Sequence, residues 1–272
     1  MVSPDAGSCG WVSRLFALLA VGLLSCGTIF VSSGQLRGAW APGEWALTPA
    51  FASQHVFRGI RLGGASAQPG LEFSAEPLAV GIWANLPFKR GSASVSGREL
   101  DLYARYAWSL GPAMTASIGF TWYHYSGSDR GTGFARSAFE PHLGIDLFFA
   151  GIRLTPRVYY DFDRRGATAE FSAAYALPLL RLGTELDFAG TIGSYRRKYD
   201  AAGMASAVTE RGDYWQFGIA IPYSLGGRST VRLGWDYIHG FDSRLHQSGS
   251  PPISNPAAGR RGVITAALMF GF

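Results

Sequence analysis

Residues Ser137–Phe162 read SAFEPHLGIDLFFAGIRLTPRVYYDF, and this stretch decides the fold. Every second residue before the Ala150-Gly151 pair is apolar, and the same alternation resumes after it. Side chains on a strand point to opposite faces with a period of two, so the stretch predicts two strands joined by a tight turn. One face of this hairpin is wholly apolar, whereas the other carries carboxylates and arginines.

Two architectures accommodate such a hairpin. A soluble sandwich packs its apolar face on a second sheet and leaves its polar face in water. A transmembrane barrel turns its apolar face to lipid and its polar face to the interior. Each predicted strand is close to the roughly 9–11 residues that cross a membrane at a tilt. The patterns of the remaining predicted strands are needed to distinguish the sandwich from the barrel.

The composition favours dispersed rather than concentrated hydrophobicity. Of 272 residues, 47% are hydrophobic and only 16% are charged, which is low for a soluble domain. No stretch after the N-terminal segment approaches the roughly 18 apolar residues of a spanning helix. The length suits one large domain. Cys9 and Cys26 are the only cysteines, so the body of the chain forms no disulfide.

The N-terminal segment has the features of an export signal. Arg14 precedes the apolar run LFALLAVGLL, and a charged region before a short apolar region is typical of a signal peptide, which we place at residues 1–34. Two cleavage sites stay open: a lipobox-like LLSC that would lipidate Cys26, and a small-residue site near Ser32–Gly34. A retained membrane anchor is a third alternative, which the short run disfavours.

Alternation recurs along the rest of the chain and predicts twelve strands. Bulges are expected at Pro141, Pro156 and Pro222, because proline cannot donate a hydrogen bond within a sheet. The first two strands are weakly patterned, so ten or fourteen strands stay open. The expected strands are 45–60, 68–75, 78–88, 99–108, 114–122, the pair within 137–162, 167–177, 182–192, 214–223, 230–239 and 263–272.

Three features favour a membrane barrel. The strand number is even, and five short turns alternate mostly with long loops. From the third strand on, the apolar faces contain no charged residue, as expected where an Arg or Lys at mid-bilayer costs about 2–4 kcal/mol. Aromatic residues cluster near strand ends, typical of interfacial girdles, although packing in a sandwich is an alternative. The predicted fold is all-β: a closed antiparallel transmembrane barrel at residues 45–272, preceded by the signal segment.

The polar faces of the predicted strands gather charged residues in the interior. Twelve strands lie between eight-stranded barrels, which side chains fill, and those of sixteen or more, which leave a channel. The lumen is therefore either a narrow pore whose facing acids and bases act on small solutes, or a closed interior in which the charges pair. The candidate pore-lining residues are Glu99, Asp101, Arg105, Glu140, Asp146, Arg153, Arg157, Asp161, Glu170, Glu185, Asp187, Arg232 and Asp236, with His142 on the same face.

No catalytic residue, metal site or cofactor is predicted. Outer-membrane phospholipases use a His–Ser pair on the lipid face, but the outward His124 and His239 fall on distant strands and no outward serine is expected beside either. We interpret both as interfacial histidines. The sequence contains no metal-ligand spacing, phosphate loop or G-x-S-x-G motif, so an enzyme is not expected.

The long-loop side of the barrel is expected to be basic. Such a rim would bind lipopolysaccharide phosphates or draw in anions, although solvation of exposed loops explains the charges equally well. Nucleic acid is not an expected partner, because the charges are scattered over separate loops of an exported chain. The basic residues are Arg61, Lys89, Arg90, Arg98, Arg130, Arg136, Arg164, Arg165, Arg196, Arg197, Lys198, Arg211, Arg244, Arg260 and Arg261.

Several short motifs resemble the TorF-type family of porins over about residues 45–272. They are VFRG at Val56–Gly59, VGIWAN at Val80–Asn85, FEP at Phe139–Pro141, YYDF at Tyr159–Phe162 and GDYW at Gly212–Trp215. The resemblance implies an outer-membrane barrel with a porin role. It also places Arg58 at the loop end of the first strand, as a candidate for the pore mouth; a loop-anchoring salt bridge is the alternative.

We therefore expect an outer-membrane channel of a Gram-negative-type bacterium that passes small hydrophilic or ionic solutes by diffusion. The alternative is a non-conducting structural or adhesive barrel with a charge-filled lumen. The chain ends on Phe272, which resembles the insertion signal read by the outer-membrane assembly machinery. The lipid bilayer and lipopolysaccharide are the other expected partners, and a homo-oligomer stays open.

Overall fold

The computed structural model describes residues 43–89, 97–126, 137–199 and 207–272. The predicted export segment, with both cysteines, lies outside these ranges. None of the described residues forms a helix long and apolar enough to span a membrane. Apart from the single 3-10 turn η3 (Leu180–Leu182), the regular structure in the described residues is β-strand.

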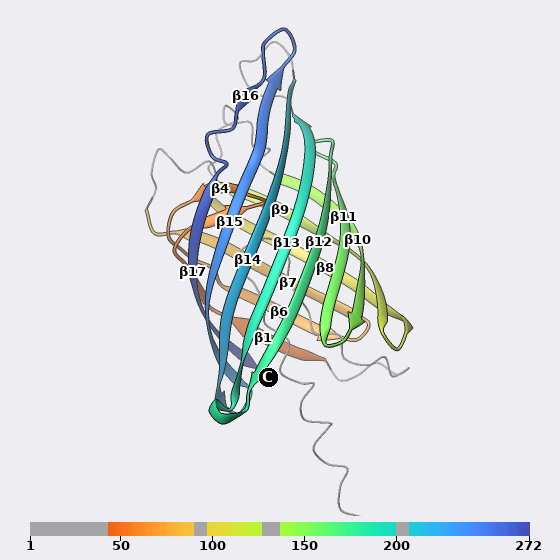
Figure 1. The fold of residues 1–272 in the computed structure, drawn as a ribbon, viewed down its shortest axis with the longest axis vertical. Helices are drawn as coiled ribbons and strands as arrows, with labels where there is room; N and C mark the ends of the chain where they lie inside the picture. Colours follow the sequence, from red (N-terminus) through yellow and green to blue (C-terminus); the bar gives the residue numbers. More distant parts are fainter. Residues whose placement is uncertain (1–42, 90–96, 127–136, 200–206) are drawn as a thin grey trace, which may run out of the picture.

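Twelve antiparallel strands in the described residues close into a barrel (Figure 1). The first two are interrupted: β1 (Glu44–Thr48) continues into β2 (Ala50–Ala52), and β5 (Ser66–Ala67) into β6 (Gly70–Ala75). The others are β7 (Leu78–Pro87), β8 (Arg98–Gly111), β9 (Met114–Ser126), β10 (Ser137–Phe149), β11 (Ile152–Asp161), β12 (Gly166–Leu179), β13 (Thr184–Tyr199), β14 (Val208–Gly226), β15 (Ser229–Gln247) and β17 (Arg260–Gly271). Because β17 pairs with both β1 and β15, the sheet has no open edge there. The predicted fold class is confirmed.

Short turns and long connections lie at opposite ends of the barrel. At the turn end, two-residue connections such as Glu76-Pro77 and Ala150-Gly151 join neighbouring strands, and the last strand meets the first where Phe272 and Trp45 exchange backbone hydrogen bonds of 2.9 Å. At the loop end, β13, β14 and β15 rise above the other strands, and β16 (Ile253–Ser254) pairs with β15 (Figure 1).

Side chains of the wall alternate between outward and inward positions, as the sequence predicts. Leu143 on β10 is 55% exposed, whereas Glu140 on the same strand is 3% exposed. On β11, Val158 is 53% exposed and Arg157 is 8% exposed. Charged residues are rarely buried in soluble proteins unless they are paired. An exposed apolar face with charges turned inward is the arrangement that a barrel in lipid requires.

Two predicted loops are largely strand. β13 continues to Tyr199 and β14 begins at Val208, so most of the loop expected at 195–212 belongs to the wall. β15 likewise continues to Gln247 instead of ending at residue 239. Outward residues in these extensions, such as Arg196 and Lys198, are as polar as the inward ones. The apolar alternation therefore disappears while backbone pairing persists, because only the part of a strand inside the bilayer needs an apolar face.

The bulges expected at three prolines are absent. Pro141 pairs with Phe120 and Pro156 with Phe171 without a shift in register. Pro222 also pairs in register, opposite Arg232. A proline removes one backbone donor from the ladder but leaves its carbonyl and both neighbours in place. The sheet therefore tolerates the loss of one backbone hydrogen bond at each proline without a bulge.

Residues between β2 and β5 leave the wall and fold into the barrel, which the sequence analysis did not predict. β3 (His55–Phe57) and β4 (Ile60–Gly63) form a separate two-stranded sheet, here called the inner hairpin. Its turn residues Arg58 and Gly59 have positive φ angles of 49° and 78°, as in a type I′ turn. The first predicted strand, 45–60, was therefore too long: the wall ends at Ala52, and the apolar remainder is buried inside.

Candidate functional site

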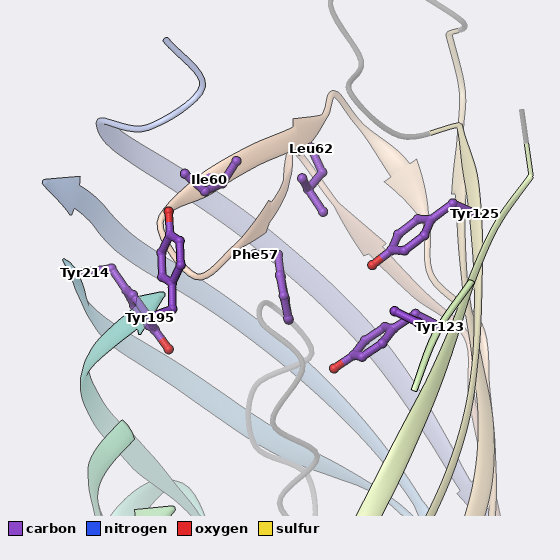
Figure 2. Close-up of a cluster of buried hydrophobic side chains, with 8 residues drawn as sticks. Phe57, Ile60, Leu62, Tyr123, Tyr125, Tyr195 and Tyr214 are labelled. Carbon is purple, nitrogen blue, oxygen red and sulfur yellow. The ribbon is translucent and has the colours of Figure 1, made fainter. Parts of the chain in front are cut away.

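The inner hairpin packs against tyrosines from two separate parts of the wall. Phe57, Ile60 and Leu62 are buried in one cluster with Tyr123, Tyr125, Tyr195 and Tyr214. Figure 2 shows the three apolar side chains between the tyrosines of β9 on one side and those of β13 and β14 on the other. All four tyrosines lie toward the loop end of their strands. The hairpin therefore crosses the lumen near the loop end.

Arg58, at the tip of the inner hairpin, binds two carboxylates of the wall. Its Nη1 and Nη2 donate to the two carboxylate oxygens of Glu140 at 2.7 and 2.8 Å, and its Nε donates to Glu170 at 3.3 Å. The guanidinium also lies 4.6 Å from the ring centre of Tyr159. Burial lowers the pKa of Arg58, but Glu140 and Glu170 reverse this and raise it above its ordinary value, so the tip stays cationic.

Tyrosine hydroxyls hold both of these carboxylates in place. Tyr123 donates to Glu140 at 3.2 Å, and Tyr159 donates to Glu170 at 2.7 Å. Tyr214 also donates to Glu170. Charge-assisted hydrogen bonds of this kind are stronger than neutral ones. The predicted pore-mouth residue is thus buried in an anchoring network, which corresponds to the salt-bridge alternative for Arg58.

The base and edge of the inner hairpin are fixed as well. The Nε2 atom of His55 lies 2.6 Å from Oε2 of Glu99, and both side chains are buried. Along the free edge, the backbone N–H of Arg61 donates to Ala257 at 3.0 Å, in the connection between β16 and β17. The hairpin is therefore attached at its tip, its base and one edge.

A second charged cluster lies on the turn side of this network. Arg105 on β8 places Nη1 3.9 Å from Oδ2 of Asp146 on β10, and Thr155 donates to the other carboxylate oxygen at 2.6 Å. Arg153 and Arg157, on β11, are also within electrostatic reach of Asp146. Four of the predicted inward residues therefore converge on one short part of the wall.

The remaining predicted inward residues lie elsewhere on the wall. Arg232 on β15 places Nε 3.6 Å from Oδ2 of Asp187 on β13. Asp161 accepts a hydrogen bond from the backbone N–H of Arg164 at 2.8 Å, at the loop end. Asp236 is buried and also lies within electrostatic reach of Arg232. Asp101 is buried and Glu185 half-buried on the inner face.

Glycines on the inner face make room for large side chains on the neighbouring strand, a feature that the sequence analysis missed. A Cβ atom on Gly193 would overlap the ring of Tyr214, its direct cross-strand partner. An aromatic ring lying over a cross-strand glycine is a known device of β-sheets. The sequence alone does not reveal these pairs, because the strand register determines which large side chain lies opposite each glycine. The other pairs are Gly81 with Tyr103, Gly212 with Tyr195, Gly119 with His142 and Gly144 with Arg157.

Two arginines of the predicted basic rim face inward instead. Arg164 is 4% exposed and places Nη1 3.5 Å from Asp161, while Arg197 donates to Glu210 at 2.8 Å. Asn255 also donates to Glu210, at 2.9 Å. These contacts hold the loop end together. The predicted rim residues Arg90, Arg130 and Arg136 lie outside the described residues.

An outward serine does accompany His124, contrary to the expectation. Nδ1 of His124 lies 3.0 Å from Oγ of Ser137, its cross-strand partner, and the ring stacks on Trp122 with centres 5.5 Å apart. The pair joins the start of β10 to the end of β9, which only the register reveals. Within the described ranges, no carboxylate contacts His124 to orient it as a catalytic base. No group of three or more potential metal ligands occurs there either.

The fold is similar to those of solved outer-membrane barrels. An outer membrane channel from Pseudomonas putida F1 has a TM-score of 0.50 at 11% identity, covering 88% of this chain and 100% of that chain. The NanC porin has a TM-score of 0.49 at 10% identity, covering 83% and 98%. LpxR from Salmonella typhimurium has a TM-score of 0.45 at 11% identity, covering 83% and 99%. At these identities the likeness shows the fold alone, which resembles that of Gram-negative outer-membrane proteins.

Comparisons of sequence identify no relative of known function. None of the curated proteins matches the chain. The resemblance of its motifs to TorF-type porins stays unconfirmed. Residues 37–164 match the model of a family described as "Bacterial protein of unknown function (Gcw_chp)".

Proposed function

We propose that the protein is a porin-like channel through which small hydrophilic or ionic solutes diffuse across the outer membrane. The observation that carries this proposal is the reversal of burial across the wall, with charged side chains turned into the lumen and apolar ones outward. Rings of charged side chains are a common means of conducting polar solutes. The shared fold with an outer membrane channel of Pseudomonas putida F1 supports the same function.

In this proposal the inner hairpin controls the width of the passage. It crosses the lumen near the loop end, and the ion pairs of Arg58 with Glu140 and Glu170 hold its tip against the wall. Solutes pass beside the hairpin or when its tip leaves the wall. The hairpin is thus the constriction, and Arg58 is the residue that keeps it narrow.

A non-conducting barrel is the second candidate, and a specific observation favours it. The hairpin and its four surrounding tyrosines occupy the loop half of the lumen with packed side chains. In small barrels side chains can fill the interior and leave no channel, and a barrel filled in this way would have a structural or surface role. In that case the Arg58 network serves stability alone.

Planar-bilayer conductance separates the two candidates. We expect single-channel steps in potassium chloride for the wild-type protein, and a larger conductance or longer open time for Arg58→Ala, because the hairpin tip loses its anchor. Arg244→Ala is the matched control: Arg244 is exposed at the loop end and pairs with Asp242 on its own strand. If neither the wild type nor Arg58→Ala gives steps at any salt concentration, the channel proposal is lost and the structural barrel remains.

Further proposals concern partners and processing. Residues 1–34 direct export, and Phe272 is read by the assembly machinery. Exposed basic residues of the loop end, such as Arg196 and Arg211, bind lipopolysaccharide phosphates. N-terminal sequencing of the mature protein tests the cleavage site and the lipidation of Cys26. Sedimentation of the detergent-solubilised protein tests for a homo-oligomer.

A further inference from the structure

We propose that Glu140, Glu170 and Tyr159 of the wall form a binding site for guanidinium-bearing solutes, here called the guanidinium site. Arg58 of the inner hairpin occupies this site, and a solute that takes its place releases the hairpin tip. The inference deepens the channel function and rests on it for the consequence of this release, but binding to the site can be measured without conduction.

The guanidinium site is built from the wall alone. Glu140 lies on β10, Tyr159 on β11 and Glu170 on β12, which are neighbouring strands. Glu140 accepts two hydrogen bonds from the guanidinium of Arg58, and Glu170 accepts a third. The ring centre of Tyr159 lies 4.6 Å from Cζ of Arg58. Carboxylates that match the forked donors, together with an aromatic face, are the groups that recognise this planar cation.

Hydroxyl groups of the wall hold the two carboxylates in position without help from the hairpin. Tyr159 donates to Glu170 at 2.7 Å, and Tyr123 donates to Glu140 at 3.2 Å. Tyr214 also donates to Glu170. A site whose side chains are already ordered binds its ligand at a smaller entropic cost. We therefore expect the guanidinium site to keep its shape when the hairpin tip leaves.

Electrostatics couple release of the tip to the binding of another cation. Arg58 donates to both carboxylates, and a buried carboxylate that loses its cation without a replacement is costly. Both signs of charge lie within electrostatic reach of Glu140 or Glu170: Asp101, Asp161, His142, Arg157 and Arg164. Since these acids and bases largely offset one another, the tip leaves the wall most easily when a second cation takes its place.

A close backbone contact holds the hairpin tip from another side. Gly59 follows Arg58 in the turn, and a Cβ atom there would lie 2.7 Å from Cα of Gly240 on β15. A Cβ atom on Gly240 would overlap the carbonyl oxygen of Gly59. The tip thus lies between the guanidinium site and Gly240. Gly240→Ala should push the tip away while leaving Arg58 and the three residues of the site unchanged.

The tether makes Arg58 a competitor of any soluble ligand. Attachment to the hairpin gives its guanidinium a high effective concentration at the site. The apparent affinity for a solute is therefore reduced by the fraction of molecules in which the site is vacant. Loosening the tip should raise the apparent affinity, removing Arg58 should raise it further, and removing Glu140 should abolish it.

Isothermal titration of the detergent-solubilised full-length protein with methylguanidinium chloride, at constant ionic strength, tests the site. We expect saturable binding to Arg58→Ala, with a dissociation constant at least about tenfold lower than that of the wild type, because the tethered competitor is gone. Gly240→Ala should give a value between the two. Gly190→Ala, on the outer face of β13, should bind as the wild type does.

Two comparisons assign the binding to this site and to this class of ligand. Arg58→Ala combined with Glu140→Gln should bind methylguanidinium at least about tenfold more weakly than Arg58→Ala, because the bidentate acceptor is lost. Poor folding does not explain such a loss, since the double variant leaves fewer uncompensated charges. Methylammonium should bind Arg58→Ala more weakly than methylguanidinium does, because an ammonium lacks the planar fork.

The outcomes that overturn the inference are distinct. Absence of saturable binding to Arg58→Ala, or equal binding to the double variant, overturns the site, and equal binding of methylammonium overturns the preference for guanidinium. Gly240→Ala retains Arg58 and both carboxylates, so binding no tighter than that of the wild type overturns competition with the tip. In planar bilayers, methylguanidinium should lengthen the open time of the wild type. Absence of conductance with binding intact removes the channel proposal alone.

Discussion

Arg58 and Glu140 form a bidentate ion pair between the inner hairpin and the barrel wall. Nη1 and Nη2 of the guanidinium lie 2.7 and 2.8 Å from the two carboxylate oxygens. The two side chains are 8% and 3% exposed, and 82 positions separate them in the sequence. Since the chain leaves the wall after Ala52, this pair joins the far end of the hairpin to the wall that it faces.

Removing Arg58 should destabilise the barrel strongly. Arg58→Ala leaves Glu140 and Glu170 buried without their cation, which typically costs about 3–5 kcal/mol. Arg58→Lys should cost less, because it keeps the charge and loses only the forked geometry. The free energy of unfolding, measured by denaturant titration of the folded barrel in detergent, checks both values.

A double variant isolates the ion pair. In Arg58→Ala combined with Glu140→Gln, part of the loss should be recovered, because one of the uncompensated charges is gone. The exposed Arg244→Ala should change stability by less than about 0.5 kcal/mol. Additive losses in the double variant would mean that the two residues act independently and would contradict the pairing.

The outward face of β10 should not tolerate charge. Leu143 is 55% exposed on the apolar face, so Leu143→Arg should cost about 2–4 kcal/mol when the barrel is folded into lipid. Ile253 on β16 is 60% exposed but lies beyond the wall at the loop end, and Ile253→Arg should be nearly neutral. Unfolding in lipid vesicles measures the two, and equal costs would argue that Leu143 does not face the bilayer core.

The wall was predictable because lipid forces a simple rule on every strand. Leu143 and Val158 are apolar since any charge there would meet hydrocarbon, and the rule repeats with a period of two. The same rule explains the failure at 195–212, where the outward Arg196 and Lys198 no longer meet lipid. The number of strands and the face on which each side chain lies could therefore be predicted from the sequence, whereas the strand ends beyond the bilayer could not.

The inner hairpin was not predictable in the same way. His55-Val56-Phe57-Arg58 places two apolar residues between two polar ones, a pattern that does not distinguish a wall strand from a segment inside the barrel, and all four side chains are buried. Its tip contacts Glu170, which lies 112 positions away, and such a contact follows only from closure of the barrel. The role of the inward residues as a pore lining stays a prediction, and which arginine meets which carboxylate depends on the register and on the hairpin.

The His124–Ser137 pair should not hydrolyse lipid esters. The two side chains are within hydrogen-bond distance at 3.0 Å, but no acid orients the histidine in the described part of the chain. We expect release of fatty acid from a fluorogenic phospholipid to stay at background for the wild type and for Ser137→Ala alike. Hydrolysis that depends on Ser137 would overturn the non-enzymatic interpretation.

Two glycines of β13 provide a matched test of how the lumen wall is packed. Gly193 faces inward, and a Cβ atom there would overlap the ring of Tyr214, which packs in the hairpin cluster and donates to Glu170. Gly190 lies on the other face of the same strand, and the nearest atom to a Cβ there is 3.8 Å away. Neither glycine has a positive φ, so the comparison isolates contact from backbone strain.

Gly193→Ala should therefore lower the free energy of unfolding by about 1–3 kcal/mol, because the Tyr214 ring must move away from Glu170 or the strands must separate. Gly190→Ala should be neutral, or stabilising by up to about 1 kcal/mol, since alanine restricts the unfolded chain more than glycine does. Denaturant unfolding in detergent measures both. Equal effects of the two substitutions would mean that the Tyr214 ring moves freely, and the network that anchors Arg58 would then not depend on this glycine.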